Sequence, residues 1–203
     1  MAYYRDHVAP RLLNRACANA RLAPWRQMVC EGLSGTIVEI GFGSGLNVPF
    51  YPTKLEQVYA VEPSPLAMKL AEKRIRAAMV PIELVGHDAH AIVLADDSCD
   101  MALSTFTLCS VEDPAFALRQ VWRVLKPGGQ YHFLEHGLAP TFALSLAQRM
   151  IDPLQHHLTE CHVTRRPLEL VRDAGFELLW SDEGPVKGPK PWSYLSAGVA
   201  VKI

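Results

Sequence analysis

Three glycines separated by single residues come directly after a β-branched run, and they are the clearest sign of a binding site in the sequence. The run covers residues 36–40, and Gly41, Gly43 and Gly45 follow it. Glycines let a backbone approach a ligand closely and adopt positive φ, so this turn predicts a ligand-binding loop. A nicotinamide dinucleotide site has its third glycine one residue later, and the carboxylate of Glu39 would repel a pyrophosphate. An ammonium group on the ligand would instead be attracted to Glu39.

Polar residues also stand at the ends of the next predicted strands. Glu62 follows a short apolar run at 58–61, where its carboxylate can accept hydrogen bonds from both hydroxyls of a ribose. Asp88 follows a third predicted strand, and its other interpretation is an aspartate that only stabilises a turn. Thr105 follows a fourth predicted strand. Doubly wound sheets bind their ligands at such strand ends.

Strand and helix patterns alternate along the chain and predict how these residues are positioned. We expect strands at 36–40, 58–61, 82–85, 101–104, 131–134, 176–180 and 195–201. We expect helices within 1–32 and at 65–79, 114–125, 141–160 and 166–174, with breaks at Pro24 and Pro153 and a tight turn at 126–129. This order predicts an α/β fold, a three-layer α/β/α Rossmann-like sandwich around a seven-stranded, mostly parallel sheet. The last two strands leave no room for a crossover helix, so they should form an antiparallel hairpin.

The glycine loop, the acidic strand ends and the segment 125–129 occur in an order that resembles the class I S-adenosyl-L-methionine-dependent methyltransferases. The resemblance covers 36–135 and implies one domain over 1–203, with a helical cap at 1–32 and a substrate side at 136–203. It also implies S-adenosylmethionine as the cofactor, with the adenine amino group bound at Asp88, and a structural role for Asp100. The cofactor-binding residues that it implies are Glu39, Gly41, Gly43, Gly45, Glu62, Pro63, Asp88, Ala89 and Thr105.

Four later segments indicate the acceptor of the methyl group. Residues 105–111, 133–136, 151–153 and 161–165 resemble the methyltransferase-like alkyl thiol methyltransferases and their bacterial relatives, with Val163 in place of a leucine. The animal members begin with a hydrophobic anchor that this chain does not show, so their membrane location does not carry over. The resemblance implies a small apolar acceptor, an alkyl or aryl thiol. Quinone or small-molecule C- or O-methyltransferases and phospholipid N-methyltransferases share the segments more loosely, and a non-catalytic S-adenosylmethionine sensor is the alternative from another class.

Direct, in-line displacement at a sulfonium methyl needs alignment of the two partners and exclusion of water. A thiol acceptor must also lose its proton, and histidine is the side chain suited to that step near neutral pH. His136, after the fifth strand, and His162, beside Cys161, are the candidate catalytic residues. His136 is equally well explained as a hydrogen-bonded structural histidine. Cys109 is most simply a small core residue.

The spacing of the histidines and cysteines predicts no metal site. His156 and His157 precede Cys161 and His162 by four to six residues, and the chain has no C-x-x-C pair of the kind that zinc sites often use. We therefore expect no bound metal.

Composition narrows the class of protein and its partners. The 203 residues are 49% hydrophobic and carry a formal net charge of -1, which excludes a disordered chain and predicts no nucleic-acid partner. Five cysteines without a C-x-x-C pair indicate a reducing compartment, and with no targeting segment we expect a cytoplasmic protein. The longest apolar run, 137–148, is too short to cross a bilayer, so we expect no integral membrane segment. Nothing in the sequence indicates the oligomeric state.

Overall fold

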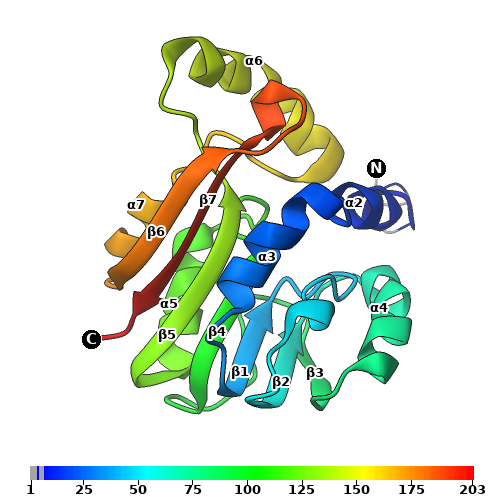
Figure 1. The fold of residues 1–203 in the computed structure, drawn as a ribbon, viewed down its shortest axis with the longest axis vertical. Helices are drawn as coiled ribbons and strands as arrows, with labels where there is room; N and C mark the ends of the chain where they lie inside the picture. Colours follow the sequence, from blue (N-terminus) through cyan, green and yellow to red (C-terminus); the bar gives the residue numbers. More distant parts are fainter. Residues whose placement is uncertain (1–3, 5–6) are drawn as a thin grey trace.

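Seven strands form one sheet at the centre of the molecule (Figure 1), which we describe from a computed structural model for residue 4 and residues 7–203. The strands are β1 (Gly35–Ile40), β2 (Leu55–Val61), β3 (Ile82–Gly86), β4 (Cys99–Thr105), β5 (Leu125–His136), β6 (Glu177–Pro185) and β7 (Tyr194–Val201). Their order across the sheet is β3-β2-β1-β4-β5-β7-β6. The first five strands pair in parallel, and β7 pairs antiparallel with both β5 and β6. The predicted fold class, including the closing hairpin, is confirmed.

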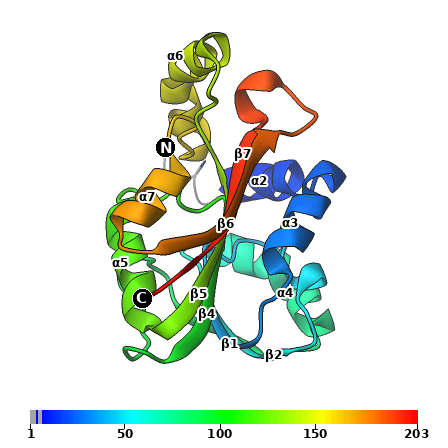
Figure 2. The same cartoon turned by 60° about the vertical axis from the view of Figure 1, so that its left-hand side comes forward.

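Helices cover both faces of this sheet. They are α2 (Ala9–Cys17), α3 (Ala23–Cys30), α4 (Pro65–Ala77), α5 (Pro114–Val124), α6 (Phe142–Thr159) and α7 (Pro167–Asp173), with short 3-10 turns η1 (Ala20–Leu22), η2 (Val48–Phe50) and η3 (Lys190–Trp192). Figure 2 shows the sheet nearly edge-on, with α3 and α4 on one face and α5 and α7 on the other. The helix α6 lies beyond the carboxyl ends of the parallel strands. None of the described helices is both long and apolar enough to cross a membrane.

The alternation of side chains along β1 explains how the two helical layers attach. Val38 and Ile40 point into the core beneath α5, whereas Ile37 packs with Val29 of α3 on the opposite face. Successive strand residues point to opposite faces, so Glu39 shares the α3 face with Ile37. The sequence of β1 therefore places a carboxylate under α3, at the carboxyl end of the central strand.

The predicted N-terminal cap is a set of short helices. The expected interruption near Pro24 is present, because η1 separates α2 from α3 and Pro24 lies in the first turn of α3. Proline suits this position because the first turn of a helix needs no backbone donor there. The predicted cap also includes 1–3, 5 and 6, which lie outside the described residues.

The structure differs from two local expectations, the helix break at Pro153 and the turn at 126–129, and tertiary contacts explain both differences. The helix α6 continues through Pro153. Before the proline, the Gln148 side chain forms hydrogen bonds with the backbone of Gly137 and Ala139. Next to it, Asp152 accepts the Val163 N–H at 2.8 Å. These contacts compensate for the helix hydrogen bond that a proline removes.

The expected turn at 126–129 lies within β5, which begins directly after α5. The backbone of this segment pairs with Lys202 through Gly128 and Gly129, at 2.8 and 2.9 Å. Asp100 holds its other side, since one carboxylate oxygen accepts the Thr36 N–H at 2.8 Å and the other contacts Lys126 at 2.5 Å. The segment is therefore an irregular strand end, and Asp100 has the structural role expected of it.

Gly198 provides a test of the packing between β5, β6 and β7. A Cβ atom at this position would lie 2.7 Å from Phe133 Cζ and 2.8 Å from the Trp180 carbonyl oxygen. We expect Gly198→Ala to lower the free energy of unfolding by about 1–3 kcal/mol in urea titrations, because the strands must move apart. Gly184→Ala is the matched control, since a Cβ there meets no atom within 4 Å. Equal unfolding midpoints for the two variants would contradict this packing.

Candidate active site

The strand order brings the predicted site residues together at the carboxyl ends of the parallel strands. After β1 the chain continues outward through β2 and β3, and β4 and β5 then lie on the other side of β1. Ligands of open α/β sheets bind at such a switch point, beyond the carboxyl ends of the strands. Glu39, Glu62, Thr105 and His136 all stand at or beside these ends.

The glycine loop needs its glycines for two different reasons. Gly41 has a φ of +66°, and a Cβ there would lie 2.1 Å from the Thr107 hydroxyl oxygen. Gly43 has a φ of +59°, and a Cβ there would meet only the Gly41 carbonyl oxygen, at 3.7 Å. Gly41 therefore allows the loop to pack on the β4 side, whereas Gly43 presents bare backbone to open space. Gly45, also at positive φ, packs beside Phe42.

Glu62 links this loop to the end of β2. Its side chain is buried, and its two oxygens accept the N–H groups of Gly43 at 2.7 Å and Ser64 at 2.9 Å. Burial raises the pKa of Glu62 above its ordinary value, and the two N–H donors oppose that shift. Each carboxylate oxygen has a second acceptor position, so Glu62 can still bind two ligand hydroxyls. Pro63 follows it on the surface.

Asp88 has a local partner in the structure. It is exposed, and its Oδ1 accepts the His90 N–H at 2.8 Å and lies 2.9 Å from His90 Nδ1. This arrangement is the turn-stabilising role that the sequence left open. Ala89 packs against the core next to it. Binding of an adenine amino group by Asp88 stays a prediction.

A buried polar network joins α3 to the ends of β1 and β4. Arg26 of α3 is 4% exposed, and its Nη1 donates to Asn47 Oδ1 and, at 2.9 Å, to Thr105 Oγ1. Asn47 in turn donates to Glu39 Oε1 at 2.9 Å and to Thr105 Oγ1 at 3.0 Å. The Tyr51 hydroxyl donates to the other oxygen of Glu39. The network therefore places a guanidinium and a carboxylate together beneath the glycine loop.

The charges in this network are held away from water. Burial raises the pKa of Glu39 to about 7, although hydrogen bonds from Tyr51 and Asn47 and the positive charge of Arg26 oppose the shift. Burial also lowers the pKa of Arg26 below its ordinary value. Among the described residues, Arg26 Nε is the buried side-chain nitrogen or oxygen that lacks a hydrogen-bond partner. A buried donor of this kind suits an anionic group on a ligand.

Sequence reasoning missed Arg26, Asn47 and Tyr51. Arg26 lies in a short helix far from the motifs, and Asn47 and Tyr51 lie in the irregular segment after the glycines. No spacing rule marks these positions, because only the fold brings α3 over the end of β1.

Phe106 lies between this network and His136. Its backbone has a φ of +57°, a strained conformation for a bulky residue and one that occurs mostly at functional sites. Its ring centroid lies 4.8 Å from that of His136 and 5.4 Å from the Arg26 guanidinium carbon. The residue after β4 thus contacts both halves of the site.

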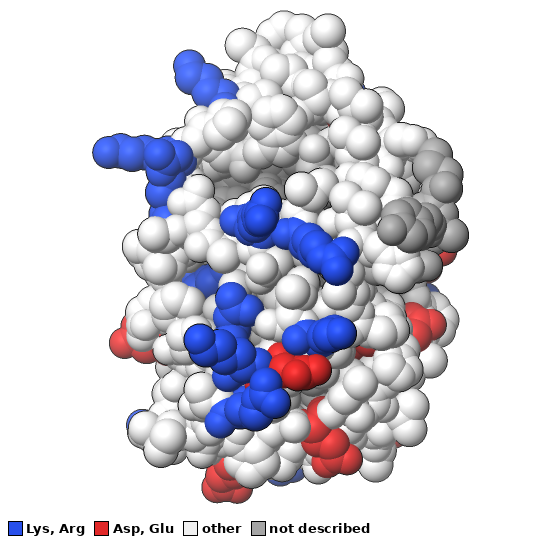
Figure 3. Space-filling view, turned by 90° about the vertical axis from the view of Figure 1, so that its right-hand side faces the viewer, with Lys and Arg blue, Asp and Glu red and all other residues white. Residues whose placement is uncertain are grey.

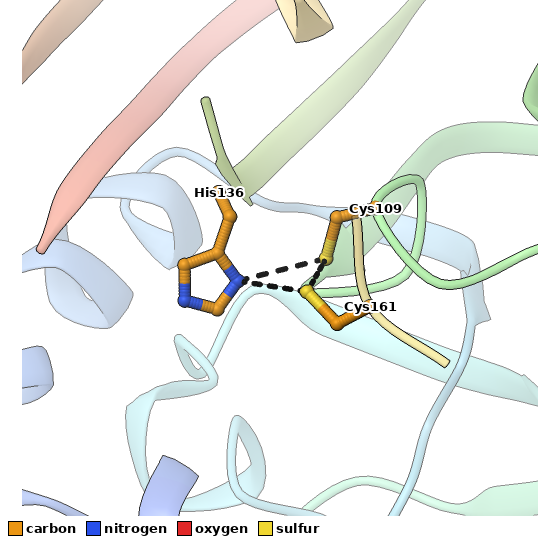
Figure 4. Close-up of side chains that lie close together, drawn as sticks. All are labelled: Cys109, His136 and Cys161. Atoms are coloured by element: carbon orange, nitrogen blue, oxygen red, sulfur yellow. Dashed lines mark hydrogen bonds between the residues drawn. The ribbon is translucent and has the colours of Figure 1, made fainter. Parts of the chain in front are cut away.

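The four segments that resemble the thiol methyltransferases meet at one place. Cys109 Sγ, Cys161 Sγ and His136 Nδ1 converge there from the loop after β4, the segment after α6 and the end of β5 (Figure 4). The two sulfurs lie 3.3 Å apart, and the nitrogen lies 3.3 Å from Cys161 and 3.7 Å from Cys109. Both cysteines are buried and His136 is half-buried. The fourth segment joins through Asp152, which accepts the Val163 N–H.

His162 is close to this cluster, but its ring is held elsewhere. Its backbone N–H donates to the Cys109 carbonyl at 2.7 Å. Its Nδ1 lies 2.9 Å from Asp152 Oδ2, and its ring stacks on His156 with centroids 4.1 Å apart. Of the two candidate catalytic histidines, the structure brings His136 to the sulfurs and leaves His162 paired with Asp152.

Glu135 holds the loop that carries Phe106 and Cys109. It is fully buried, and it accepts the N–H groups of Thr107 at 3.0 Å and Cys109 at 3.1 Å and the hydroxyl of Ser104 at 3.0 Å. Burial raises its pKa above the ordinary value, and these donors oppose the shift. Arg165 closes the far end of the loop, donating to the Val111 carbonyl at 2.7 Å.

Basic side chains gather on the face formed by α2 and α4, as Figure 3 shows. The two helices pack together and flank the glycine loop, where Asn14 accepts the Ser44 hydroxyl at 2.7 Å and Arg74 donates to the Ser44 carbonyl at 2.9 Å. The exposed basic residues of these helices are Arg11, Arg15, Lys69, Lys73 and Arg76. The surface beside the glycine loop is therefore locally positive, although the net charge of the whole chain is near zero.

Comparisons with known proteins agree with this geometry. The family described as Methyltransferase domain matches residues 38–133. Thiol S-methyltransferase TMT1B of Rattus norvegicus is 34% identical over 171 residues, which cover 80% of this chain and 67% of that protein. Demethylmenaquinone methyltransferase of Renibacterium salmoninarum is 28% identical over 143 residues, or 68% of this chain and 58% of that protein. A SAM-dependent methyltransferase of Thermotoga maritima shares the fold, with a TM-score of 0.69, 24% identity and coverage of 99% and 98% of the two chains.

The buried carboxylate of Glu39 predicts a pH-dependent stability. Its pKa is about 7 in the folded protein, above its ordinary value of 4.5, so the folded state binds more protons than the unfolded state between these values. The free energy of unfolding therefore loses up to roughly 3 kcal/mol from this group as pH rises from below 4.5 to above 7. Urea titrations across this range should show a shallower decline for Glu39→Gln than for the wild type, and an unchanged decline for the exposed-site control Glu72→Gln. Parallel profiles for Glu39→Gln and the wild type would contradict the assignment.

Proposed function

This chain belongs to the S-adenosylmethionine-dependent methyltransferases, and we propose that it methylates the sulfur of a small alkyl or aryl thiol. The observation that carries the proposal is the meeting of the segments around Cys109, His136 and Cys161 beside the carboxyl ends of the strands. These are the segments in which the sequence resembles the thiol methyltransferases. The relative that is 34% identical is itself named a thiol S-methyltransferase.

The residues at the glycine loop fit S-adenosylmethionine. The backbone at Gly43 faces open space that a Cβ atom would occupy, and Glu62 beside it has acceptor positions for the two ribose hydroxyls. The unpartnered Nε of Arg26 suits the carboxylate of the methionine part, and the carboxylate of Glu39 suits its ammonium group. When bound, the cofactor supplies an electrophilic methyl group and a neutral thioether leaving group.

The chain's own contribution to the reaction is alignment and exclusion of water. Phe106 lies between the residues that suit the cofactor and those on the acceptor side, and its half-buried ring shields this region. His136 is the group on the acceptor side that can take the proton from the thiol, because one ring nitrogen, Nε2, points away from the two sulfurs (Figure 4). The acceptor sulfur then forms its bond to the methyl carbon as the carbon–sulfur bond of the cofactor breaks.

The state of the cysteines supports a location in the cytoplasm. All five cysteines are present as free thiols, which suits a reducing compartment such as the cytoplasm.

A small-molecule acceptor is favoured because the site lies among short loops and α6, which leave little chain for a macromolecular interface. The alternatives are methylation of a quinol or another small molecule at carbon or oxygen, methylation of a phospholipid amine, and cofactor binding without turnover.

Glu62 provides the test of the cofactor site. We expect Glu62→Gln to weaken the binding of S-adenosylhomocysteine at least tenfold in isothermal titration calorimetry. The glutamine amide would replace one acceptor oxygen by a donor that faces the N–H of Gly43 or Ser64. Glu72→Gln, on the exposed face of α4, should bind as the wild type does. Equal affinities for Glu62→Gln and the wild type would remove Glu62 from the cofactor site.

The acceptor class is tested by screening thiols, quinols, amines and phospholipids with mass-spectrometric detection of methylated products. We expect S-methylated thiols, with one S-adenosylhomocysteine formed per product. His136→Gln should lower kcat at least tenfold with an unchanged KM for the cofactor, whereas the exposed-site control His157→Gln should retain activity. Turnover limited to quinols or lipids would replace the thiol proposal, and tight cofactor binding without any turnover would support the sensor alternative.

A further inference from the structure

Cys109, Cys161 and His136 form a group of three metal-ligand side chains that the proposed methyl transfer does not by itself require. Their Sγ and Nδ1 atoms all lie within 4.8 Å of one another. Cys109 and Cys161 are 52 positions apart in the sequence, and His136 lies 27 and 25 positions from them. These separations explain why spacing rules predicted no metal site.

We propose that Cys109, Cys161 and His136 bind a cation that prefers thiolate and imidazole ligands, such as Zn²⁺, and that the acceptor thiol occupies its fourth coordination position. Two sulfurs and one nitrogen are a ligand set that zinc uses in proteins. Sites with three protein ligands keep one position open for water or substrate, whereas purely structural sites have four protein ligands.

The distances between the ligand atoms are close to those of a tetrahedral site. With typical zinc bond lengths, two thiolate sulfurs lie about 3.8 Å apart, and a sulfur and an imidazole nitrogen lie about 3.6 Å apart. The observed sulfur–sulfur distance is 3.3 Å, and the sulfur–nitrogen distances are 3.3 and 3.7 Å. A bound ion therefore requires the two sulfurs to separate by roughly 0.5 Å. The geometry is pre-formed to within a small rotation of the cysteine side chains.

The charges around the cluster also suit such an ion. Two thiolates and a neutral imidazole balance the charge of a divalent cation, so the complex adds no net charge to a buried place. Arg165 contributes a positive charge beside Cys109 and Cys161, and Glu135 contributes a buried carboxylate that attracts a cation. The N–H groups that Glu135 accepts keep that carboxylate on the loop, and it supplies no fourth ligand atom to the cluster.

The fourth position has a chemical use that rests on the thiol acceptor proposed above. A thiol that binds there would release its proton to solvent water and present a thiolate at neutral pH. Its sulfur forms a bond to the methyl carbon while the carbon–sulfur bond of the cofactor breaks, and the bonding pair stays on the cofactor sulfur. The resulting thioether is neutral and a weaker ligand, so it can leave. In this arrangement His136 would bind the ion through Nδ1. The ion, rather than His136 as a base, would then promote the loss of the thiol proton.

The test measures metal binding on the full chain, reduced with a phosphine that contains no thiol. After incubation with Zn²⁺ and gel filtration, we expect about one zinc per chain by elemental analysis. Substitution with Co²⁺ should produce thiolate-to-metal charge-transfer absorption. Cys109→Ala and Cys161→Ala should each lose the metal, His136→Gln should weaken binding at least tenfold, and Cys99→Ala, a buried cysteine at the opposite end of β4, should bind as the wild type does.

The wild-type measurements decide the question even if a cysteine variant fails to fold. Reduced wild-type protein that retains no zinc and gives no charge-transfer band would overturn the site, as would full zinc retention by both cysteine variants. An air-oxidised Cys109–Cys161 disulfide, found by peptide mapping in protein that binds no zinc when reduced, would also overturn it.

The acceptor role is tested separately from the thiol activity. Adding 2-mercaptoethanol to the cobalt-loaded protein should shift its absorption, and removing zinc with a chelator should lower thiol turnover at least tenfold, with recovery on adding zinc back. Zinc binding without thiol turnover would leave the metal site in place and refute the proposed acceptor. Thiol turnover that is unaffected by zinc removal would support the acceptor and refute its place on the ion.

Discussion

The buried carboxylate of Glu135 holds the loop after β4, and both halves of the active site depend on that loop. A carboxylate without water is stable only when donors satisfy its oxygens, and here the N–H groups of Thr107 and Cys109 and the hydroxyl of Ser104 do so. The same hydrogen bonds fix the position of Thr107 against Gly41 and of Cys109 against Cys161. The cofactor loop and the sulfur cluster are thus positioned by one buried charge.

Two other buried carboxylates repeat this principle at neighbouring strand ends. Glu62 accepts backbone N–H groups from the glycine loop and from the start of α4, and Glu39 accepts side-chain donors from Asn47 and Tyr51. Each has a pKa above its ordinary value because burial disfavours the charged form. A cationic cofactor at this edge would meet carboxylates that its own charge helps to ionise, which couples cofactor binding to the protonation of the site.

The fold by itself does not specify an acceptor, since one cofactor-binding architecture serves many reactions. What is particular to this chain lies after β4, after β5 and after α6, where three separate segments bring Cys109, His136 and Cys161 together. Arg26 and Phe106 connect that cluster with the cofactor side, because the guanidinium lies over the ring and the ring lies against His136. Residues from four different parts of the fold therefore meet within one small region, which is the region where we propose that the acceptor thiol binds.

The sequence by itself determined the fold class, the glycine loop and the acidic strand ends, because each depends on residues that are neighbours along the chain. A β-branched run followed by Gly41 and Gly43, or an apolar run followed by Glu62, can be recognised from a few consecutive residues. Only the tertiary structure decided that Arg26 lies beneath the glycine loop and that Cys109 and Cys161 meet. It also overruled the expected break at Pro153, where contacts from distant residues outweigh a local cost. The physical reason is the same in each case: hydrogen bonds and ligand geometry depend on distance in space, and the strand order of the sheet sets those distances.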